Sequence, residues 1–197
     1  MSGYKDKISF AILVGGKSSR MGRDKSQMKI DGNMTFLEKL DCELGDIFGA
    51  VDKYISVNDT QNIEIKGYET VKDLAPDIGP LGGIFSVLTQ TSQDYVLFVA
   101  CDMPGLTKEA VSYLLDKWDG EDMCIASTDK GRQPLVGIYS KACVLPIKNQ
   151  IERGLYKPVL ILELVNSKVV DMREFEECFV NINTVDEYKR YWNGQKV

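Results

Sequence analysis

Histidine is absent from the sequence of 197 residues. Without an imidazole, the chain cannot assemble a Cys–His or Ser–His nucleophile pair, so enzymes that depend on such a pair are excluded. Paired cysteines are absent as well: there is no C-x-x-C, and the five cysteines stand far apart in the sequence. An odd number at wide spacing argues against a disulfide framework and against a zinc site. We therefore expect reduced thiols, most of them buried.

Long apolar runs are also missing. No segment approaches the ~20 consecutive apolar residues that a membrane-spanning helix needs. The polar start, MSGYKDK, is unlike a secretory signal. The sequence therefore predicts a cytoplasmic protein with no membrane partner.

Positive charge is in the minority. The formal net charge is −5, from 24 basic and 29 acidic residues, which argues against a nucleic-acid partner. An acidic total does not exclude an anionic ligand, because binding depends on the local field around that ligand rather than on the sum over the chain.

The composition that is present is ordinary for a globular protein, with 44% apolar and 27% charged residues. At this length we expect one domain that spans residues 1–197. Segments with strand periodicity alternate with segments of helix periodicity along the chain. This alternation predicts an α/β three-layer sandwich with a mostly parallel central sheet.

Some elements are predicted more sharply than others. Tyr95–Ala100 is continuously apolar, which suits a central strand covered on both faces. Thr35 and Glu38 form a capping box before apolar residues at helical spacing. Phe179–Ile182 is expected to be a late strand before a last helix, and a helical pattern begins near position 142. The other expected strands are 8–13, 54–57, 68–71, 123–126, 135–139 and 168–171.

The most informative stretch is the loop that follows the first strand. Gly15 and Gly16 end that strand and allow the backbone to approach a ligand closely. Successive N–H groups in such a loop form a concavity that binds anions, and nearby cations add to the attraction. The loop suits a triphosphate, because four cations follow against one acid (Lys17, Arg20, Arg23 and Lys25 against Asp24).

Two common phosphate loops can be tested against this stretch, and neither matches. A P-loop requires a glycine five positions before Gly16, but Ala11 stands there. The dinucleotide fingerprint G-x-G-x-x-G requires its second glycine at Lys17. The loop is therefore glycine-rich and cationic in a third way.

The pattern L-x-G-G-x-x-x-R-M-G-x-x-K begins at Leu13 and ends at Lys25. It resembles the signature loop of GT-A-like nucleotidyltransferases, and within these it is most similar to the molybdenum cofactor guanylyltransferase family. The resemblance implies the Rossmann-like architecture of nucleotide-diphospho-sugar transferases. It also implies Mg²⁺-dependent transfer of GMP from GTP to the terminal phosphate of molybdopterin, or of its molybdenum-loaded form, with release of pyrophosphate.

The resemblance assigns roles to individual residues. Asp102, in the context Cys101–Pro104, would bind the metal, and it would act in catalysis together with Lys25 and Arg20. Nucleotide binding would occupy about residues 8–105 and acceptor binding the remainder. The residues implied in nucleotide binding are Leu13, Val14, Gly15, Gly16, Lys17, Lys25, Asn58, Asp73 and Asp102.

The implied acceptor site uses Gly82, in the loop 79–83, together with Asn181 and Asn183. The two asparagines are two positions apart in the expected late strand, so both would point to one face. The chain departs from the family at Gln133-Pro134, where a His-Pro pair is common, and its basic stretch is reduced to Arg153 and Lys157.

Alternatives remain open. The residues do not fix the base, so a same-fold enzyme is a second reading: a molybdopterin cytidylyltransferase, or one that acts on a sugar or polyol phosphate. A third reading is a non-catalytic nucleotide-binding module that hands a cofactor to a partner, although such a module does not require both Lys25 and Asp102. The expected protein partners are a molybdopterin-delivering protein and molybdoenzyme apo-proteins.

Overall fold

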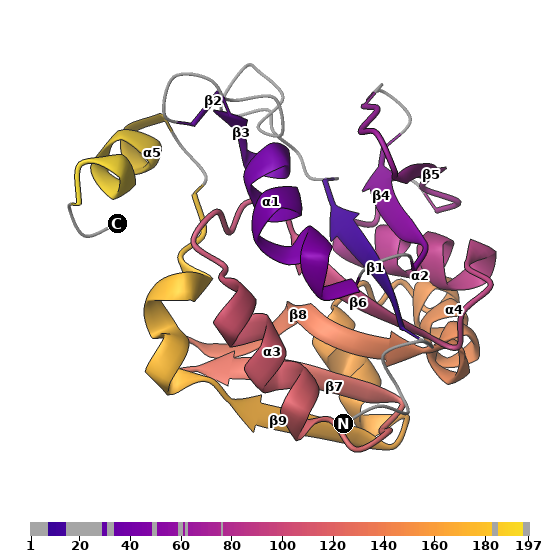
Figure 1. Cartoon of the computed structure of the whole chain (residues 1–197). Coiled ribbons are helices and arrows are strands. Elements are labelled where there is room, and N and C mark those ends of the chain that lie inside the picture. The colour runs from indigo at the N-terminus through magenta and orange to yellow at the C-terminus, as the bar shows by residue number, and fades with distance from the viewer. Residues whose placement is uncertain are drawn as a thin grey trace.

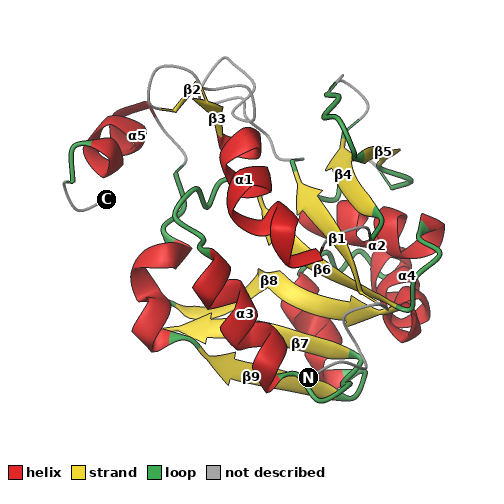
Figure 2. Ribbon diagram, viewed as in Figure 1, coloured by secondary structure: helices red, strands yellow, loops and turns green. Residues whose placement is uncertain are grey.

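The computed structural model describes residues 8–14, 29–30, 34–48, 51–58, 61, 63–75, 77–182 and 185–194. Its main sheet has seven strands in the order β5-β4-β1-β6-β8-β7-β9, with helices on both faces (Figures 1 and 2). The strands are β1 (Ile8–Leu13), β4 (Lys53–Val57), β5 (Glu69–Lys72), β6 (Tyr95–Ala100), β7 (Met123–Thr128), β8 (Gly131–Ser140) and β9 (Ser167–Asp171). A small antiparallel pair is formed by β2 (Lys29–Ile30) and β3 (Met34–Thr35).

The main sheet is mostly parallel, as the sequence predicted. The strand β1 pairs in parallel with β4 and with β6, and β4 pairs in parallel with β5. The strand β8 pairs antiparallel with β6 and with β7, and β7 pairs in parallel with β9. Among these seven strands, β8 alone therefore runs against the others.

Two hydrophobic clusters cover the two faces of the sheet. In front, as Figure 1 is drawn, are α1 (Phe36–Phe48) and α3 (Lys108–Lys117), which contribute Leu40 and Leu114 to one cluster. Behind are α2 (Pro80–Gln90) and α4 (Val144–Glu152), with Ile84 and Ile147 in the other. The remaining helices are α5 (Val185–Trp192) and the 3₁₀ segments η4 (Lys141–Cys143), η5 (Pro158–Glu163) and η6 (Arg173–Phe179).

The local signals for several elements are confirmed. The strand β6 has the predicted bounds, and all its residues after Tyr95 are buried. At the start of α1, the Glu38 N–H donates to Thr35 Oγ1 at 3.1 Å and the Thr35 N–H donates to Glu38 Oε2 at 2.6 Å, which is a complete capping box. Thr107 caps α3 by accepting from the Ala110 N–H.

Other predictions were wrong in detail. The strand β7 extends to Thr128, and β8 begins at Gly131 rather than near position 135. Residues 79–83 are not a loop, because α2 already begins at Pro80.

The segment 179–182 is not a strand. Phe179 ends η6, and residues 180–182 are in neither a helix nor a strand. This segment crosses beyond the end of β6, where the Ile182 N–H donates to the Asp102 carbonyl, and so it does not run alongside another strand. The argument that Asn181 and Asn183 share a face of a strand therefore fails, and Asn183 lies outside the described residues.

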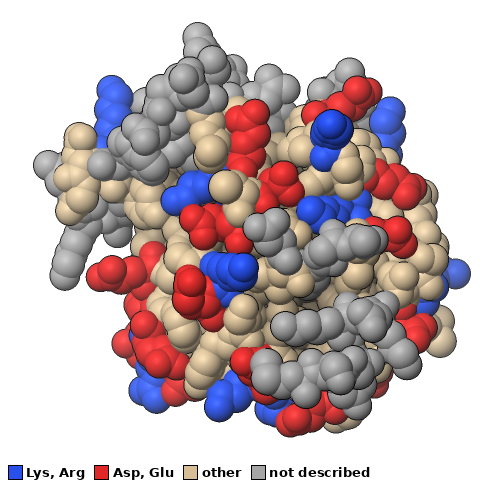
Figure 3. Space-filling model, in the orientation of Figure 1, with Lys and Arg blue, Asp and Glu red and all other residues tan. Residues whose placement is uncertain are grey.

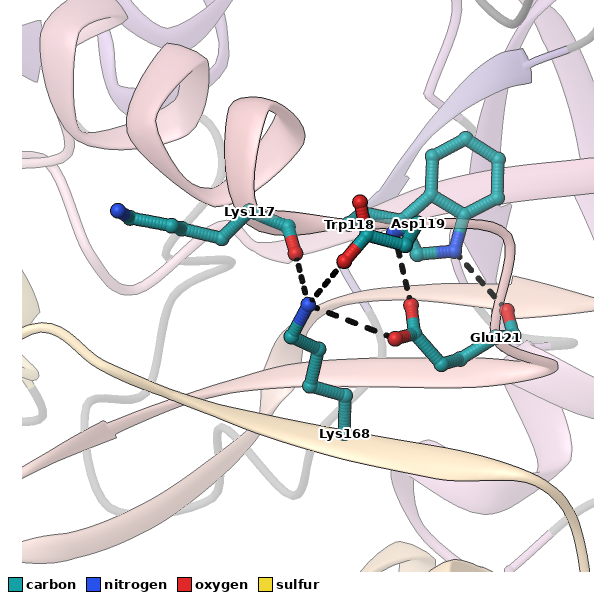
Figure 4. Close-up of polar contacts among 5 residues, drawn as sticks. All are labelled: Lys117, Trp118, Asp119, Glu121 and Lys168. Carbon is teal, nitrogen blue, oxygen red and sulfur yellow. Dashed lines mark hydrogen bonds and ion pairs between the residues drawn. The ribbon is translucent and has the colours of Figure 1, made fainter.

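Ion pairs and hydrogen bonds join β9 to the end of α3 at the edge of the sheet where β7 and β9 begin (Figure 4). The Lys168 ammonium, on β9, donates to the Lys117 carbonyl at the end of α3 and lies 2.6 Å from Asp119 Oδ2 and 3.5 Å from Glu121 Oε1. The Trp118 indole N–H donates to the Glu121 carbonyl at 2.9 Å. Together these contacts fix the carboxyl end of α3 against β9.

Acidic and basic side chains are interspersed over the face that carries α1 and α3 (Figure 3). The described side chains on this face therefore create no extended field of one sign.

Within the part of the chain that the structure describes, no helix has both the length and the apolar character that crossing a membrane requires.

Candidate active site

Four neighbouring parallel strands end at the same edge of the sheet (Figure 2). Across that edge, Asp73 follows β5, Asn58 follows β4, Val14 follows β1 and Asp102 lies two residues beyond β6. In open α/β sheets, ligands bind in the crevice outside the carboxyl ends of the strands. The predicted nucleotide-binding residues that the structure describes therefore lie side by side where such a site is expected.

The backbone ladder continues past the ends of these strands. The Val14 N–H donates to the Ser56 carbonyl at 3.0 Å, and the Cys101 N–H donates to the Leu13 carbonyl at 3.0 Å. The Asp73 N–H donates to the Val57 carbonyl at 3.1 Å. These bonds fix the point at which each loop leaves the sheet, so they position the side chains that follow.

Asp73 is also positioned through its side chain. The Ser56 hydroxyl, buried on β4, donates to Asp73 Oδ1 at 3.1 Å. The next residue is tied to α2, because the Leu74 N–H donates to Ser86 Oγ at 2.8 Å. Sequence reasoning missed Ser56, although a serine inside an otherwise apolar strand was a signal of a buried polar contact.

The glycines at the start of α2 allow that helix to lie close to the strand ends. A Cβ at Gly83 would lie 2.4 Å from Ser56 Oγ and 3.1 Å from Leu13 Cδ2. A Cβ at Gly82 would lie 2.6 Å from the Ala75 carbonyl oxygen. Gly82 thus has a packing role here, and its implied contact with the acceptor stays a prediction.

Asn58 begins a loop that is braced through its backbone. Its N–H donates to Gln61 Oε1 at 3.2 Å, and its carbonyl accepts from the Gln61 N–H at 3.2 Å. These bonds hold Asn58 at the end of β4, beside Asp73.

Asp102 joins the sheet to the carboxyl-terminal part of the chain. Asp102 is half-buried, and its Oδ1 atom is inaccessible to solvent. Its carbonyl accepts from the Ile182 N–H at 2.9 Å, which places the exposed Asn181 next to the Asp102 loop. The helix α5 packs against the same loop, since a Cβ at Gly105 would lie 2.8 Å from the Tyr191 hydroxyl.

Six of the predicted site residues lie outside the described residues, and their roles stay predictions: Gly15, Gly16, Lys17, Arg20, Lys25 and Asn183.

Two of the buried cysteines are unsuited to act as nucleophiles. Burial raises the pKa of the Cys124 and Cys143 thiols to about 12, so both are protonated at neutral pH. Cys101, next to Asp102, is also buried. These positions agree with the expectation of buried thiols.

Comparison with known proteins decides the family. Residues 10–163 match the family described as the MobA-like NTP transferase domain. The chain belongs to this family. A family relative from Clostridium perfringens (strain 13 / Type A), named probable molybdenum cofactor guanylyltransferase, is 35% identical over 192 residues, 93% of this chain and 95% of the relative. The molybdenum cofactor guanylyltransferase of Vibrio atlanticus is 30% identical over 195 residues, 94% of this chain and 95% of the relative.

Solved structures show that the fold of the MobA-like family is shared more widely. Molybdopterin-guanine dinucleotide biosynthesis protein A of Archaeoglobus fulgidus has a TM-score of 0.77 at 24% identity, over 94% of this chain and 97% of that one. The 2-C-methyl-D-erythritol 4-phosphate cytidylyltransferase of Francisella tularensis has a TM-score of 0.69 at 12% identity, over 96% of this chain and 100% of that one. At these identities the likeness concerns the fold alone.

Proposed function

We propose that this protein transfers GMP from GTP to the terminal phosphate of molybdopterin, with release of pyrophosphate. The observation that carries the proposal is the row of polar residues across four parallel strand ends, from Asp73 to Asp102. The names of the full-length relatives favour guanylyl transfer over the other reactions of this fold.

The order of the strands suggests how the nucleotide lies. Asp73 and Asn58 stand at one end of the row and would read the base and ribose through carboxylate and amide groups. The end of β1 lies in the middle of the row, and the amides of the residues that follow it, together with Lys17, would meet the phosphates. Asp102 stands at the other end, so the acceptor phosphate would approach from the side of β8 and Asn181.

The metal requirement fits the donor set. Among the described residues, no three Cys, Asp or Glu side chains group closely enough to hold a metal ion by themselves. Mg²⁺ typically takes one or two protein carboxylates and completes its shell with substrate phosphates and water, so a single carboxylate at Asp102 suits it. When bound, Mg²⁺ would neutralise charge on the phosphates.

The protein has little covalent work in this reaction. The acceptor phosphate is already an anion at neutral pH, so the absence of histidine is no obstacle to the attack on the α-phosphorus. Lys25 would stabilise the charge that develops on the transferred phosphoryl group, and Arg20 would help to orient the acceptor. The cytoplasmic location and the protein partners stay predictions.

A thermal melt with Mg²⁺ and each of GTP, CTP, ATP and UTP tests the nucleotide. A ligand at a hundred times its Kd stabilises by ~2.7 kcal/mol, which for a chain of this size raises the melting temperature by roughly 5–10 °C. We expect this rise with GTP, and pyrophosphate release once molybdopterin is added. A rise with CTP alone would replace the proposal by a cytidylyltransferase of the same fold. No rise with any nucleotide, with or without molybdopterin, would overturn it.

A further inference from the structure

The inference concerns the strand β8 on the far side of Asp102, and it rests on the proposed function. Along β7, Ile125 pairs with Gly137, but the next residue, Ala126, pairs with Gln133. Residues 134–136 are thus displaced from the ladder as a bulge. Such bulges often lie next to active sites, where they redirect the strand and its side chains.

The bulge lies where β8 separates from β6. Their register ends at the pair Phe98 and Gly137, and it does not include the last two residues of β6. Because β8 runs antiparallel to β6, the residues before Gly137 lie at the edge of the sheet where β6 ends, and Gln133 is therefore at the same edge as Asp102. The bulge therefore lies toward the edge of the sheet that carries Asp102, on the side from which the acceptor would come.

Two features hold the bulge in place. Gly137 permits the close approach of β7, because a Cβ there would lie 2.7 Å from Ile125 Cγ2 and 2.8 Å from the Cys124 carbonyl oxygen. Tyr139 closes the loop of the bulge, because its hydroxyl donates to the Pro134 carbonyl at 2.6 Å. This bond satisfies a carbonyl that has left the β7–β8 ladder.

Tyr139 is itself held firmly. Its side chain is fully buried and its ring meets the ring of Phe98 edge-on, with 5.5 Å between centroids. Burial keeps the pKa of the phenol well above its ordinary value, so the hydroxyl remains a donor. At the other end of the bulge, Gln133 Nε2 donates to Thr128 Oγ1 at 3.3 Å.

We propose that Tyr139 is a positioning residue for the acceptor: through Pro134 it fixes the bulge and with it Gln133, which forms the wall of the acceptor pocket next to Asp102. The side-chain amide of Gln133 is neutral and can both donate and accept hydrogen bonds, which suits the polar edge of a pterin. The effect of Tyr139 falls on the binding of the acceptor, while nucleotide binding depends on the strands on the other side of Asp102.

The test compares Tyr139→Phe with Tyr54→Phe. Both lose the hydroxyl of a buried tyrosine in the same hydrophobic cluster, but the Tyr54 hydroxyl bonds the Thr91 side chain, far from the strand ends that carry the site. KM for molybdopterin, KM for GTP and kcat are measured for both. We expect Tyr139→Phe to raise the molybdopterin KM about fivefold, with GTP KM and kcat changed less than about twofold, and Tyr54→Phe to leave all three unchanged.

An unchanged molybdopterin KM in Tyr139→Phe, or an equal rise in both variants, would overturn the inference while leaving the function intact. Failure of the proposed function has a different signature, since the wild-type protein would then show no GTP-induced thermal shift and no transfer. If Tyr139→Phe does not fold, Gln133→Ala decides the matter, because this side chain is partly exposed. Gln133→Ala should raise the molybdopterin KM with the GTP shift preserved, and an unchanged KM again overturns the inference.

Discussion

The two sides of Asp102 are built differently. On one side, β5, β4, β1 and β6 run in parallel, and backbone hydrogen bonds continue past their ends. On the other side, β8 runs in the opposite direction, separates from β6 after Phe98 and carries a bulge at 134–136. On the first side, the polar residues follow strands whose backbone hydrogen bonds continue to the strand ends. On the second side, they lie in a strand that has separated from β6.

This difference suits two different ligands. In open α/β sheets a nucleotide is typically bound by loops at the carboxyl ends of parallel strands. Enzymes of one fold can also differ in their acceptor, and a bulged strand can change its side chains without disturbing the parallel ladder. The predictions below act on Asp102 itself, which is the junction of the two sides, on one of the two sides, or on the opposite edge of the sheet.

The largest effect is expected at the junction. Asp102→Asn should lower turnover by a factor on the order of 10² or more, because the neutral amide supplies no charge to a metal–phosphate complex. The melting temperature without ligand should stay within about 2 °C of the wild type, and the part of the GTP-induced shift that needs Mg²⁺ should be lost. Asp116→Asn, an exposed change on α3, is the control. An active Asp102→Asn enzyme would remove Asp102 from the mechanism.

The next prediction compares how much stability each side loses when a buried glycine is replaced by alanine. In Gly137→Ala the new Cβ would meet Cys124 backbone and the Ile125 side chain, which we expect to cost about 2–3 kcal/mol and to lower the melting temperature by roughly 4–12 °C. In Gly83→Ala the new Cβ meets the Ser56 hydroxyl, which can rotate away, and alanine favours the helix by about 1 kcal/mol.

Gly83→Ala should therefore be the milder change in stability, but it should weaken GTP binding because the rotated hydroxyl no longer reaches Asp73. Differential scanning calorimetry and a GTP titration measure the two quantities. A greater loss of stability in Gly83→Ala than in Gly137→Ala would contradict the proposed difference between the sides.

The parallel side could largely be predicted from the sequence, because its signals are local. The apolar run Tyr95–Ala100 gave the bounds of β6, and the spacing of Thr35 and Glu38 gave the start of α1. Asn58, Asp73 and Asp102 were implied by the family resemblance, and they form a row because each comes directly after or shortly after one of the parallel strands that end at this edge.

The other side could not be predicted in the same way, because its structure depends on contacts between distant residues. The bulge is defined by how β8 pairs with β7, and no local pattern at Pro134 reveals that pairing. Phe179–Ile182 has a pattern typical of a strand, but a strand needs a neighbouring strand, and the Ile182 N–H bonds instead to the loop after β6. The bond from Ser56 to Asp73 joins residues 17 apart in the sequence and was missed for the same reason.

A smaller effect tests whether Asp73 is positioned through the sheet. Ser56→Ala removes the hydroxyl that donates to Asp73 Oδ1, so the carboxylate loses a neutral hydrogen bond worth about 1 kcal/mol. We expect the Kd for GTP to rise by roughly threefold to tenfold, with the molybdopterin KM unchanged. Ser92→Ala is the matched control, since that exposed hydroxyl donates to Asp52 Oδ2 at 3.0 Å away from the site. Equal GTP affinities in the two variants would argue against a role for Asp73 in nucleotide binding.

The smallest effect is expected at the opposite edge of the sheet, where Lys168 joins α3 to β9. Its bond to Asp119 raises the pKa of Lys168, so the stabilisation is fully present below pH 10.5, the ordinary value, and is lost as the pH rises through the raised pKa. Lys168→Met should therefore lower the melting temperature slightly at pH 8, less so in high salt, and the difference from the wild type should vanish at higher pH. Both KM values should stay unchanged, because the pairs lie at the edge away from Asp102. A changed KM for either substrate would show that the two edges are coupled, and the site could then no longer be treated as two sides that meet only at Asp102.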